Sequence, residues 1–165
     1  MSCDENVMVR PLRRGDGEFL CSIFKDNAEY YEIFFDSESE ISEWDKRVVS
    51  FIKQSEISHF IIEANSNPVG WLSYLDVSGE ERELGILVIS KENLQCGYGA
   101  KSLSWLIEKS QADHMHTLML NVNQSNARAI RFYKKFGFEI YDEEIIPQCN
   151  DAVNLAQYKM KLSLI

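Results

Sequence analysis

Apolar residues recur along this chain at two spacings, one typical of strands and one typical of helices. Alternation with a period of two marks segments such as 116–123, whereas i, i+3, i+4 spacing marks segments such as 39–55 and the stretch that starts at Asn126. These patterns predict the order β-α-α-β-β-β-α-β-α-β-β. The expected elements cover residues 6–12, 17–24, 39–55, 59–64, 69–77, 82–89, a helix of about three turns after Gly99, 116–123, 126–136, 138–145 and 155–164.

Turn signals connect these elements into a mixed sheet. The sequence NSNP at 65–68 predicts a hairpin between its flanking strands, and Gly137 is expected to end the helix before it. The strand–loop–helix–strand unit at 83–123 is a crossover, so its two strands should be parallel neighbours. We therefore expect an α/β fold with a mixed, mostly antiparallel sheet and helices on both faces.

Length, charge and composition narrow the class of protein. A chain of 165 residues fits a single domain spanning 1–165. The net charge of −9 argues against a protein that coats nucleic acid. No apolar run approaches the roughly 20 residues that span a membrane, and the N-terminus lacks the apolar core of a signal peptide. The expected location is the cytoplasm, with the protein a monomer or homodimer.

The cysteines and histidines do not suggest a metal site. Four cysteines are scattered at Cys3, Cys21, Cys96 and Cys149, and the three histidines have no ligand-like spacing to them. The sequence therefore predicts neither a disulfide framework nor a bound metal.

A glycine pair marks the strongest candidate for chemistry. Gly97 and Gly99 stand between an expected strand and an expected helix. Such a pair can be a plain turn, or it can open a helix whose first N–H groups bind a phosphate. Neither a Walker lysine nor the third glycine of a dinucleotide fingerprint follows, since Ala100, Lys101 and Ser102 come next.

Two motifs in residues 83–139 resemble those of the GCN5-related N-acetyltransferase (GNAT) superfamily. The first is the Arg/Gln-x-x-Gly-x-Gly/Ala loop, which reads Leu94-Gln95-Cys96-Gly97-Tyr98-Gly99; its leading Arg/Gln is replaced by Leu94, with Gln95 one position late. The second, in LNVNQSNARAIRFYKKFGFEI, matches the family at Asn126, Ala129, Tyr133, Gly137 and Phe138. The N-terminal part is similar to the branch that acetylates ribosomal-protein N-termini and to its antibiotic- and metabolite-modifying relatives.

The resemblance implies an acetyl-CoA site beside a parallel strand pair. Main-chain amides near the end of one strand would hold the pantetheine arm, and loop amides would hold the pyrophosphate. Asn126 would orient the cofactor arm or a water, although it could also serve only as a helix N-cap. The cofactor-binding residues expected on this basis are Leu87, Val88, Ile89, Gln95, Cys96, Gly97, Tyr98, Gly99, Ala100, Asn126 and Ala129.

The same resemblance implies roles for two catalytic residues. Tyr133 would donate a proton to the leaving thiolate; alternatively, it is a core aromatic stacked with Phe132 and Phe136. Glu83 would act as the base for the amine; alternatively, it is a solvated strand end, as its neighbours in EERELG suggest, and water deprotonates the amine. Cys96 in the loop could be a nucleophile, but no histidine lies near it in sequence.

Charge along the chain suggests which amine is acetylated. Eight carboxylates and no Lys or Arg occur between Asp26 and Asp45, next to several aromatic residues. This stretch would steer a cationic amine toward the acceptor site, or it is an ordinary solvated surface. Arg128, Arg131, Lys134 and Lys135 stand within expected reach of the coenzyme's phosphates. The predicted activity is direct acetyl transfer to a small-molecule amine or a protein N-terminal amine. The alternative is a catalytically silent, CoA-binding sensor or scaffold.

Overall fold

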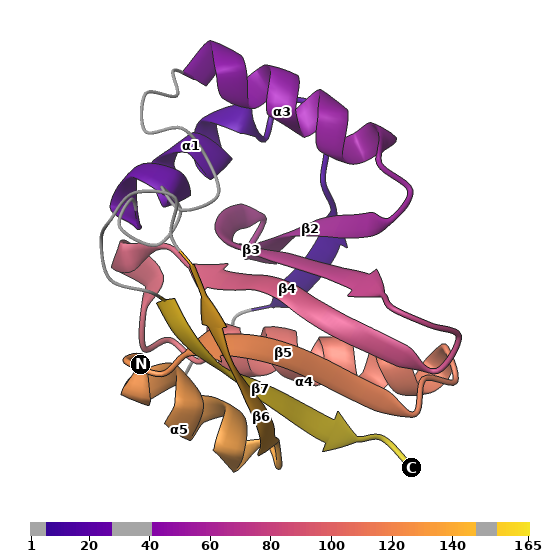
Figure 1. Ribbon diagram of the computed structural model, residues 1–165. Coiled ribbons are helices and arrows are strands. Elements are labelled where there is room, and N and C mark those ends of the chain that lie inside the picture. Colours follow the sequence, from indigo (N-terminus) through magenta and orange to yellow (C-terminus); the bar gives the residue numbers. More distant parts are fainter. Residues whose placement is uncertain (1–5, 28–40, 148–154) are drawn as a thin grey trace. The chain divides into compact units, whose positions relative to one another are not determined.

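The structure is a computed structural model that describes residues 6–27, 41–147 and 155–165 (Figure 1). Within these ranges its elements follow the order predicted from the sequence, and a short 3-10 helix is added to them. They are β1 (Val7–Pro11), α1 (Gly17–Asp26), α3 (Ile41–Lys53), β2 (Ile57–Ala64), β3 (Asn67–Asp76), β4 (Glu81–Ile89), η1 (Lys91–Asn93), α4 (Tyr98–Ala112), β5 (Thr117–Asn123), α5 (Ala127–Lys135), β6 (Glu139–Ile146) and β7 (Leu155–Ser163).

Hydrogen bonds join the strands in the order β1-β2-β3-β4-β5-β7-β6. The β2–β3 hairpin is antiparallel, and its turn residues Asn65 and Ser66 both have positive φ, as the NSNP signal predicts. β4 and β5 are parallel neighbours, so the predicted crossover is confirmed. The expected mixed, mostly antiparallel α/β fold is therefore confirmed.

Contacts within the chain divide it into two compact units. The first unit comprises Met1–Leu75 and Ile86–Leu106, and the second comprises Asp76–Gly85 and Ile107–Ile165. β4 contributes to both, because the division falls between Gly85 and Ile86.

The core of the first unit lies between two helices and the sheet. Figure 1 shows α1 and α3 together on one side of β2 and β3. Trp44 of α3 is fully buried, with its ring 5.3 Å from Phe24 of α1 and 6.3 Å from Trp71 of β3. The apolar stripes that predict α1 and α3 thus become the contact surface between these helices and the strands.

The second unit is built around β5 and β7. Along β5, Leu118, Leu120 and Val122 are buried while the residues between them are half-buried or exposed, as period-two alternation requires. β7 pairs with β5 and β6, antiparallel to both. α5 ends where Gly137 adopts a φ of 92°, which confirms the predicted stop.

Among the described helices, none combines the length and the apolar character that a membrane span requires.

Candidate functional site

The glycine-containing segment is a loop from β4 into the first turn of α4. Gly97 has a φ of 80°, in the left-handed region that favours glycine, and immediately precedes the first helical residue, Tyr98. Lys101 N–H donates to the Gly97 carbonyl at 3.1 Å. The amides of Tyr98, Gly99 and Ala100 precede this bond, so helix geometry leaves them without an intrahelical acceptor. The segment therefore places amides without an intrahelical acceptor at a helix start, and their contact with a phosphate stays a prediction.

Backbone and side-chain hydrogen bonds on both sides of the loop hold it in place. Ser90 N–H donates to the Val69 carbonyl at 2.9 Å, and Asn93 Nδ2 donates to Ser90 Oγ at 2.8 Å. The Tyr98 side chain is buried, and its carbonyl accepts a 2.7 Å hydrogen bond from the hydroxyl of buried Ser102. These contacts anchor the backbone before and after Gly97.

Two further loop residues have features that the sequence did not reveal. Gln95 adopts a φ of 65° although it has a Cβ. This backbone conformation is uncommon for residues other than glycine. Cys96 is a half-buried free thiol, with Sγ 3.7 Å from the Leu94 carbonyl oxygen.

Leu87, Val88 and Ile89 form the last residues of β4, in the first unit, and are half-buried. The hydrogen-bonded register between β4 and β5 runs from Glu81 to Leu84 on β4. The predicted pantetheine-binding residues thus follow the part of β4 that pairs with β5.

Asn126 is the N-cap of α5. Its Oδ1 accepts a hydrogen bond of 3.1 Å from Ala129 N–H, which satisfies one of the free amides of the first turn. The predicted capping role is confirmed. Any contact of Asn126 or Ala129 with a cofactor stays a prediction.

Tyr133 lies in α5, half-buried among aromatic rings. Its ring centroid is 5.3 Å from that of Phe132 and 5.7 Å from that of Phe138, both in edge-on arrangements. Phe136 contacts Phe132 instead, at 5.2 Å. The aromatic cluster predicted around Tyr133 therefore exists with Phe138 in place of Phe136, and it leaves the role of the hydroxyl open.

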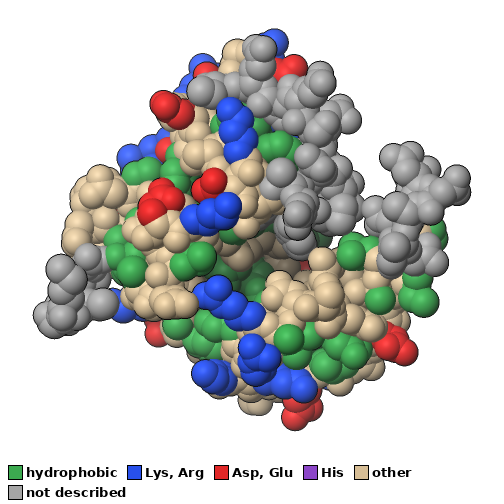
Figure 2. Space-filling model, turned by 90° about the vertical axis from the view of Figure 1, so that its left-hand side faces the viewer, with side chains coloured by type: hydrophobic (Ala, Val, Ile, Leu, Met, Phe, Trp, Pro, Cys, Tyr) green, Lys and Arg blue, Asp and Glu red, His purple; other side chains and the backbone are tan. Residues whose placement is uncertain are grey.

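Basic side chains follow the exposed side of the same helix. Figure 2 shows Lys and Arg side chains gathered low on the face that carries α5. Exposed residues of α5 that contribute such charge are Arg128, Arg131, Lys134 and Lys135.

Glu83 is half-buried on β4 in the second unit. Its Oε1 accepts a hydrogen bond of 3.3 Å from Asn121 Nδ2 on β5. Burial raises the pKa of Glu83, and the positive charge of Lys159 acts in the opposite direction. Glu81, which alternation places on the same face, is exposed. Of these two glutamates, Glu83 is the less exposed, and its role as a base stays a prediction.

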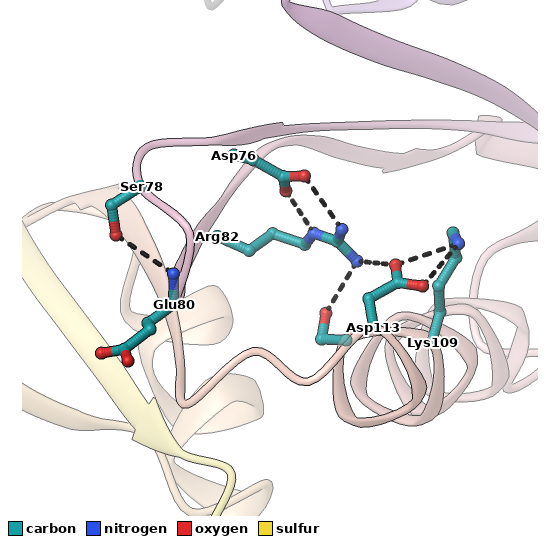
Figure 3. A network of polar contacts seen from close by, with 7 residues as sticks. Asp76, Ser78, Glu80, Arg82, Lys109 and Asp113 are labelled. Atoms are coloured by element: carbon teal, nitrogen blue, oxygen red, sulfur yellow. Dashed lines mark hydrogen bonds and ion pairs between the residues drawn. The ribbon is translucent and has the colours of Figure 1, made fainter.

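The residue before Glu83 anchors this end of β4. Figure 3 shows the Arg82 side chain between Asp76 at the end of β3 and Asp113 just after α4. Arg82 Nε lies 2.7 Å from Asp76 Oδ1, and Arg82 Nη1 lies 2.9 Å from Asp113 Oδ2. Because Arg82 is buried on one face of the strand, its neighbour Glu83 is turned to the other.

Sequence reasoning missed two residues on the face that carries Glu83, Asn121 and Lys159, and the anchoring role of Arg82 on the opposite face. A weak signal was available, because a lone arginine among glutamates in a strand points to a specific partner. Strand alternation in 116–123 and 155–164 also places Asn121 and Lys159 opposite the core residues. Which of these residues meet Glu83 depended on the strand register.

The acidic stretch lies mostly outside the described residues. Asp26 ends α1, and Glu43 and Asp45 are exposed on α3. The other acidic and aromatic members, Glu29, Tyr30, Tyr31, Glu32, Phe34, Phe35, Asp36, Glu38 and Glu40, fall outside the ranges given above. Within those ranges, no group of three or more His, Cys, Asp or Glu could hold a metal ion.

Comparison with known proteins places these features in context. The sequence model described as the acetyltransferase (GNAT) family matches residues 20–138, a span that contains every predicted site residue. A search of curated protein sequences gives no match.

Solved structures share the fold at low sequence identity. The spermidine N-acetyltransferase from Vibrio cholerae, in complex with CoA and spermine, has a TM-score of 0.81 at 17% identity, covering 96% of this chain and 95% of that one. The ribosomal-protein-S18-alanine N-acetyltransferase from Escherichia coli has a TM-score of 0.74 at 19% identity, with 96% and 94% covered. A probable GNAT-family acetyltransferase from Chromobacterium violaceum has a TM-score of 0.81 at 14% identity, with 96% and 87% covered.

Proposed function

The chain belongs to the acetyltransferase (GNAT) family, and from this premise we propose that it moves acetyl directly to a primary amine of a small molecule or a protein N-terminus. It is an N-acetyltransferase with acetyl-CoA as the donor. The observation that carries the proposal is the anchored loop at Gly97, which opens α4 inside the span that the family model matches.

The residues of the loop fit a coenzyme pyrophosphate. A Cβ built on Gly97 would meet no atom within 4 Å, so the backbone there is open to a ligand. Amides at the start of α4 carry partial positive charge and suit a phosphate. We assign the pyrophosphate to the amides of residues 95–100, with Leu87, Val88 and Ile89 for the pantetheine arm and Asn126 and Ala129 as further contacts.

Two side chains would handle the protons of the reaction. Acetyl-CoA supplies the acetyl group as a thioester. Attack on it requires a neutral amine, so a base must remove a proton, and the leaving thiolate must gain one. Glu83, with its raised pKa, is the proposed acceptor at its carboxylate, and the Tyr133 hydroxyl is the proposed donor.

A cationic amine is the proposed acceptor. Eight carboxylates without a compensating base lie between Asp26 and Asp45, and an acidic surface raises the local concentration of cations. A spermidine N-acetyltransferase among the solved structures that share the fold supports this choice. A protein N-terminus is the second candidate for the acceptor, because the ribosomal-protein-S18-alanine N-acetyltransferase has the same fold.

The proposal is tested by measuring free thiol released from acetyl-CoA across a panel of amines. The panel contains spermidine, a monoamine of similar length and a peptide with a free N-terminus. Amine-dependent thiol release, with acetylated product identified by mass spectrometry, supports the enzyme. Binding of acetyl-CoA in calorimetry without thiol release for any amine would instead support the silent sensor or scaffold.

The salt dependence of kcat/KM tests whether the acidic stretch attracts a polycationic amine more strongly than a monoamine. Raising ionic strength from 0.01 M to 0.15 M shortens the Debye length from about 30 Å to about 8 Å. We expect kcat/KM for spermidine to fall more than that for the monoamine. Neutralising Glu29, Glu32 and Asp36 together should remove the difference while leaving acetyl-CoA affinity unchanged; equal salt dependence before and after would make the stretch a solvated surface.

A further inference from the structure

The face of the sheet that carries Glu83 presents polar side chains on four strands, β4, β5, β7 and β6. On β5, Leu118 and Leu120 are buried, so Met119 and Asn121 point to the opposite face. Glu83 of β4 is paired with Met119 in the parallel register. Asn121 is in turn paired with Lys159 of β7.

Glu83 is therefore in contact with one of these polar residues and within the field of another. Asn121 Nδ2 donates to Glu83 Oε1 at 3.3 Å. The positive charge of Lys159, which is paired with Asn121 in the register, opposes the effect of burial on the pKa of Glu83. Lys159 Nζ also lies 3.4 Å from Glu144 Oε2 on β6. A carboxylate, an amide, an ammonium group and a second carboxylate thus follow one another from β4 to β6.

This arrangement addresses a requirement of any carboxylate base. The group must be ionised before it can accept a proton, and it must hold a defined orientation toward the amine. Burial makes the ionised carboxylate a stronger base, but it also favours the neutral form, which cannot accept the proton. A hydrogen-bond donor and a positive charge both favour the ionised form.

We propose that Asn121 and Lys159 are positioning residues for Glu83, which keep its carboxylate oriented and ionised so that it can accept the proton of the amine. Asn121 sets the orientation through its hydrogen bond. Lys159 supplies a positive charge, which interacts with the carboxylates of both Glu83 and Glu144. The inference rests on the proposed role of Glu83 as the base.

Other charged groups on this face define the controls. Glu81 precedes Glu83 on the same face of β4 and is exposed. On β7, Lys161 Nζ lies over the Tyr141 ring at 5.2 Å, and Lys161 is paired with Met119 in the register. On β6, Asp142 is paired with Lys159 in the register, in addition to the Glu144 contact. Met119 and Asn121 of β5 carry no charge.

The test titrates the Glu83 carboxyl directly. In protein with ¹³C-labelled glutamate, the side-chain carboxyl signal absent from Glu83→Gln identifies this group, and its chemical shift is followed against pH. We expect Lys159→Met and Asn121→Leu each to raise the pKa of Glu83. Glu144→Gln should lower the pKa of Glu83, because Lys159 would then lose the carboxylate that its ammonium group contacts on β6.

Two further variants distinguish the effect of the Lys159 charge from a general effect of substituting a lysine on β7. Lys159→Arg keeps the positive charge and should restore the titration of the parent. Lys161→Met removes a lysine from the same face of the same strand and should change the Glu83 titration less than Lys159→Met. If Lys159→Met and Asn121→Leu leave the Glu83 titration where it was, the positioning role is wrong.

Kinetics then distinguish this inference from the proposed function. The acidic limb of the kcat/KM profile for the best amine of the panel should move to higher pH in Lys159→Met. At pH 7, the decrease in kcat/KM caused by Lys159→Met should be smaller than the roughly 10²- to 10⁴-fold decrease expected for Glu83→Gln. A shifted carboxyl titration with an unmoved pH–rate profile would support the positioning residues and overturn Glu83 as the base.

Discussion

Arg82 Nη1 lies 2.9 Å from Asp113 Oδ2, and this contact joins the start of β4 to the residue that follows α4. The arginine side chain is only 3% exposed, whereas its partners Asp76 and Asp113 are 46% and 34% exposed. A single buried cation thus holds two carboxylates at the edge of solvent (Figure 3). This network anchors the start of β4, where Glu83 directly follows Arg82.

Removing the buried cation should destabilise the protein. Arg82→Met keeps most of the side-chain volume but leaves Asp76 and Asp113 without their shared partner. Because both carboxylates can still reach water, we expect the free energy of unfolding to fall by about 2–3 kcal/mol, below the usual range for a fully buried pair. Urea denaturation measures the change. Lys109→Met, which removes the 3.0 Å contact of a more exposed lysine with Asp113, should cost under about 0.5 kcal/mol; equal costs for the two variants would contradict the assignment.

His59 should make stability depend on pH in mildly acidic solution. Burial lowers the pKa of His59 to about 4, while Nδ1 accepts a 3.3 Å hydrogen bond from Trp71 Nε1 and the ring stacks on Phe51 at 4.4 Å. In the unfolded chain the pKa is about 6.5. Between these values the unfolded state binds a proton that the folded state does not, so stability falls as pH is lowered through this window. The contribution of one proton is at most about 1.4 kcal/mol per pH unit.

The measurement is a series of urea denaturation curves between pH 4 and pH 7. His59→Gln has no group that titrates in this window, so its stability should vary less steeply with pH than that of the parent. The slopes are compared rather than the absolute stabilities, because the substitution also removes the ring contacts. An identical slope in both proteins would show that His59 has the same pKa in the folded and unfolded states and would contradict the prediction.

Gly97 should be required for acetyl-CoA binding. Its positive φ strains any residue with a Cβ, by about 1–2 kcal/mol, and an aspartate would also bring negative charge to the proposed phosphate site. We expect the strain to lower the stability of Gly97→Asp, and the repulsion between its carboxylate and the pyrophosphate to weaken binding by about tenfold or more, a factor that corresponds to about 1.4 kcal/mol. Calorimetric titration with acetyl-CoA measures this, and Gly99→Asp should behave similarly.

Gly79→Asp is the matched control for the added charge. Its Cβ would meet no atom within 4 Å. This variant should titrate acetyl-CoA like the parent. Unchanged affinity in Gly97→Asp and Gly99→Asp as well would exclude the loop as the pyrophosphate site.

Tyr133→Phe should lower turnover without altering the fold or the affinity for acetyl-CoA. Only a hydroxyl is lost, and the ring contacts with Phe132 and Phe138 can remain. If the hydroxyl donates the proton to the leaving thiolate, kcat should fall by roughly 10²- to 10⁴-fold. Tyr141→Phe, an exposed tyrosine of β6, is the control and should keep the turnover of the parent. Unchanged kcat in Tyr133→Phe, with chemistry rate-limiting, would make Tyr133 a packing residue.

The sequence by itself determined the elements, their order and the loop. Period-two and helical spacings depend on neighbouring residues, as do the turn at Asn65 and Ser66 and the helix stop at Gly137, so local backbone preferences were sufficient to predict them. The Asn126 cap could be predicted for the same reason, because donor and acceptor lie within one helical turn. The parallel pairing of β4 and β5 followed from the length of the crossover between them.

Only the tertiary structure decided the environments of Glu83, Arg82 and His59. Their partners come from other strands and helices, and a shift of one residue in strand register would have turned each partner to the opposite face. Burial is likewise a property of the packed chain, so the raised pKa of Glu83 and the lowered pKa of His59 could not be predicted from spacing. The candidate base was visible in the sequence, but the residues that tune it were not.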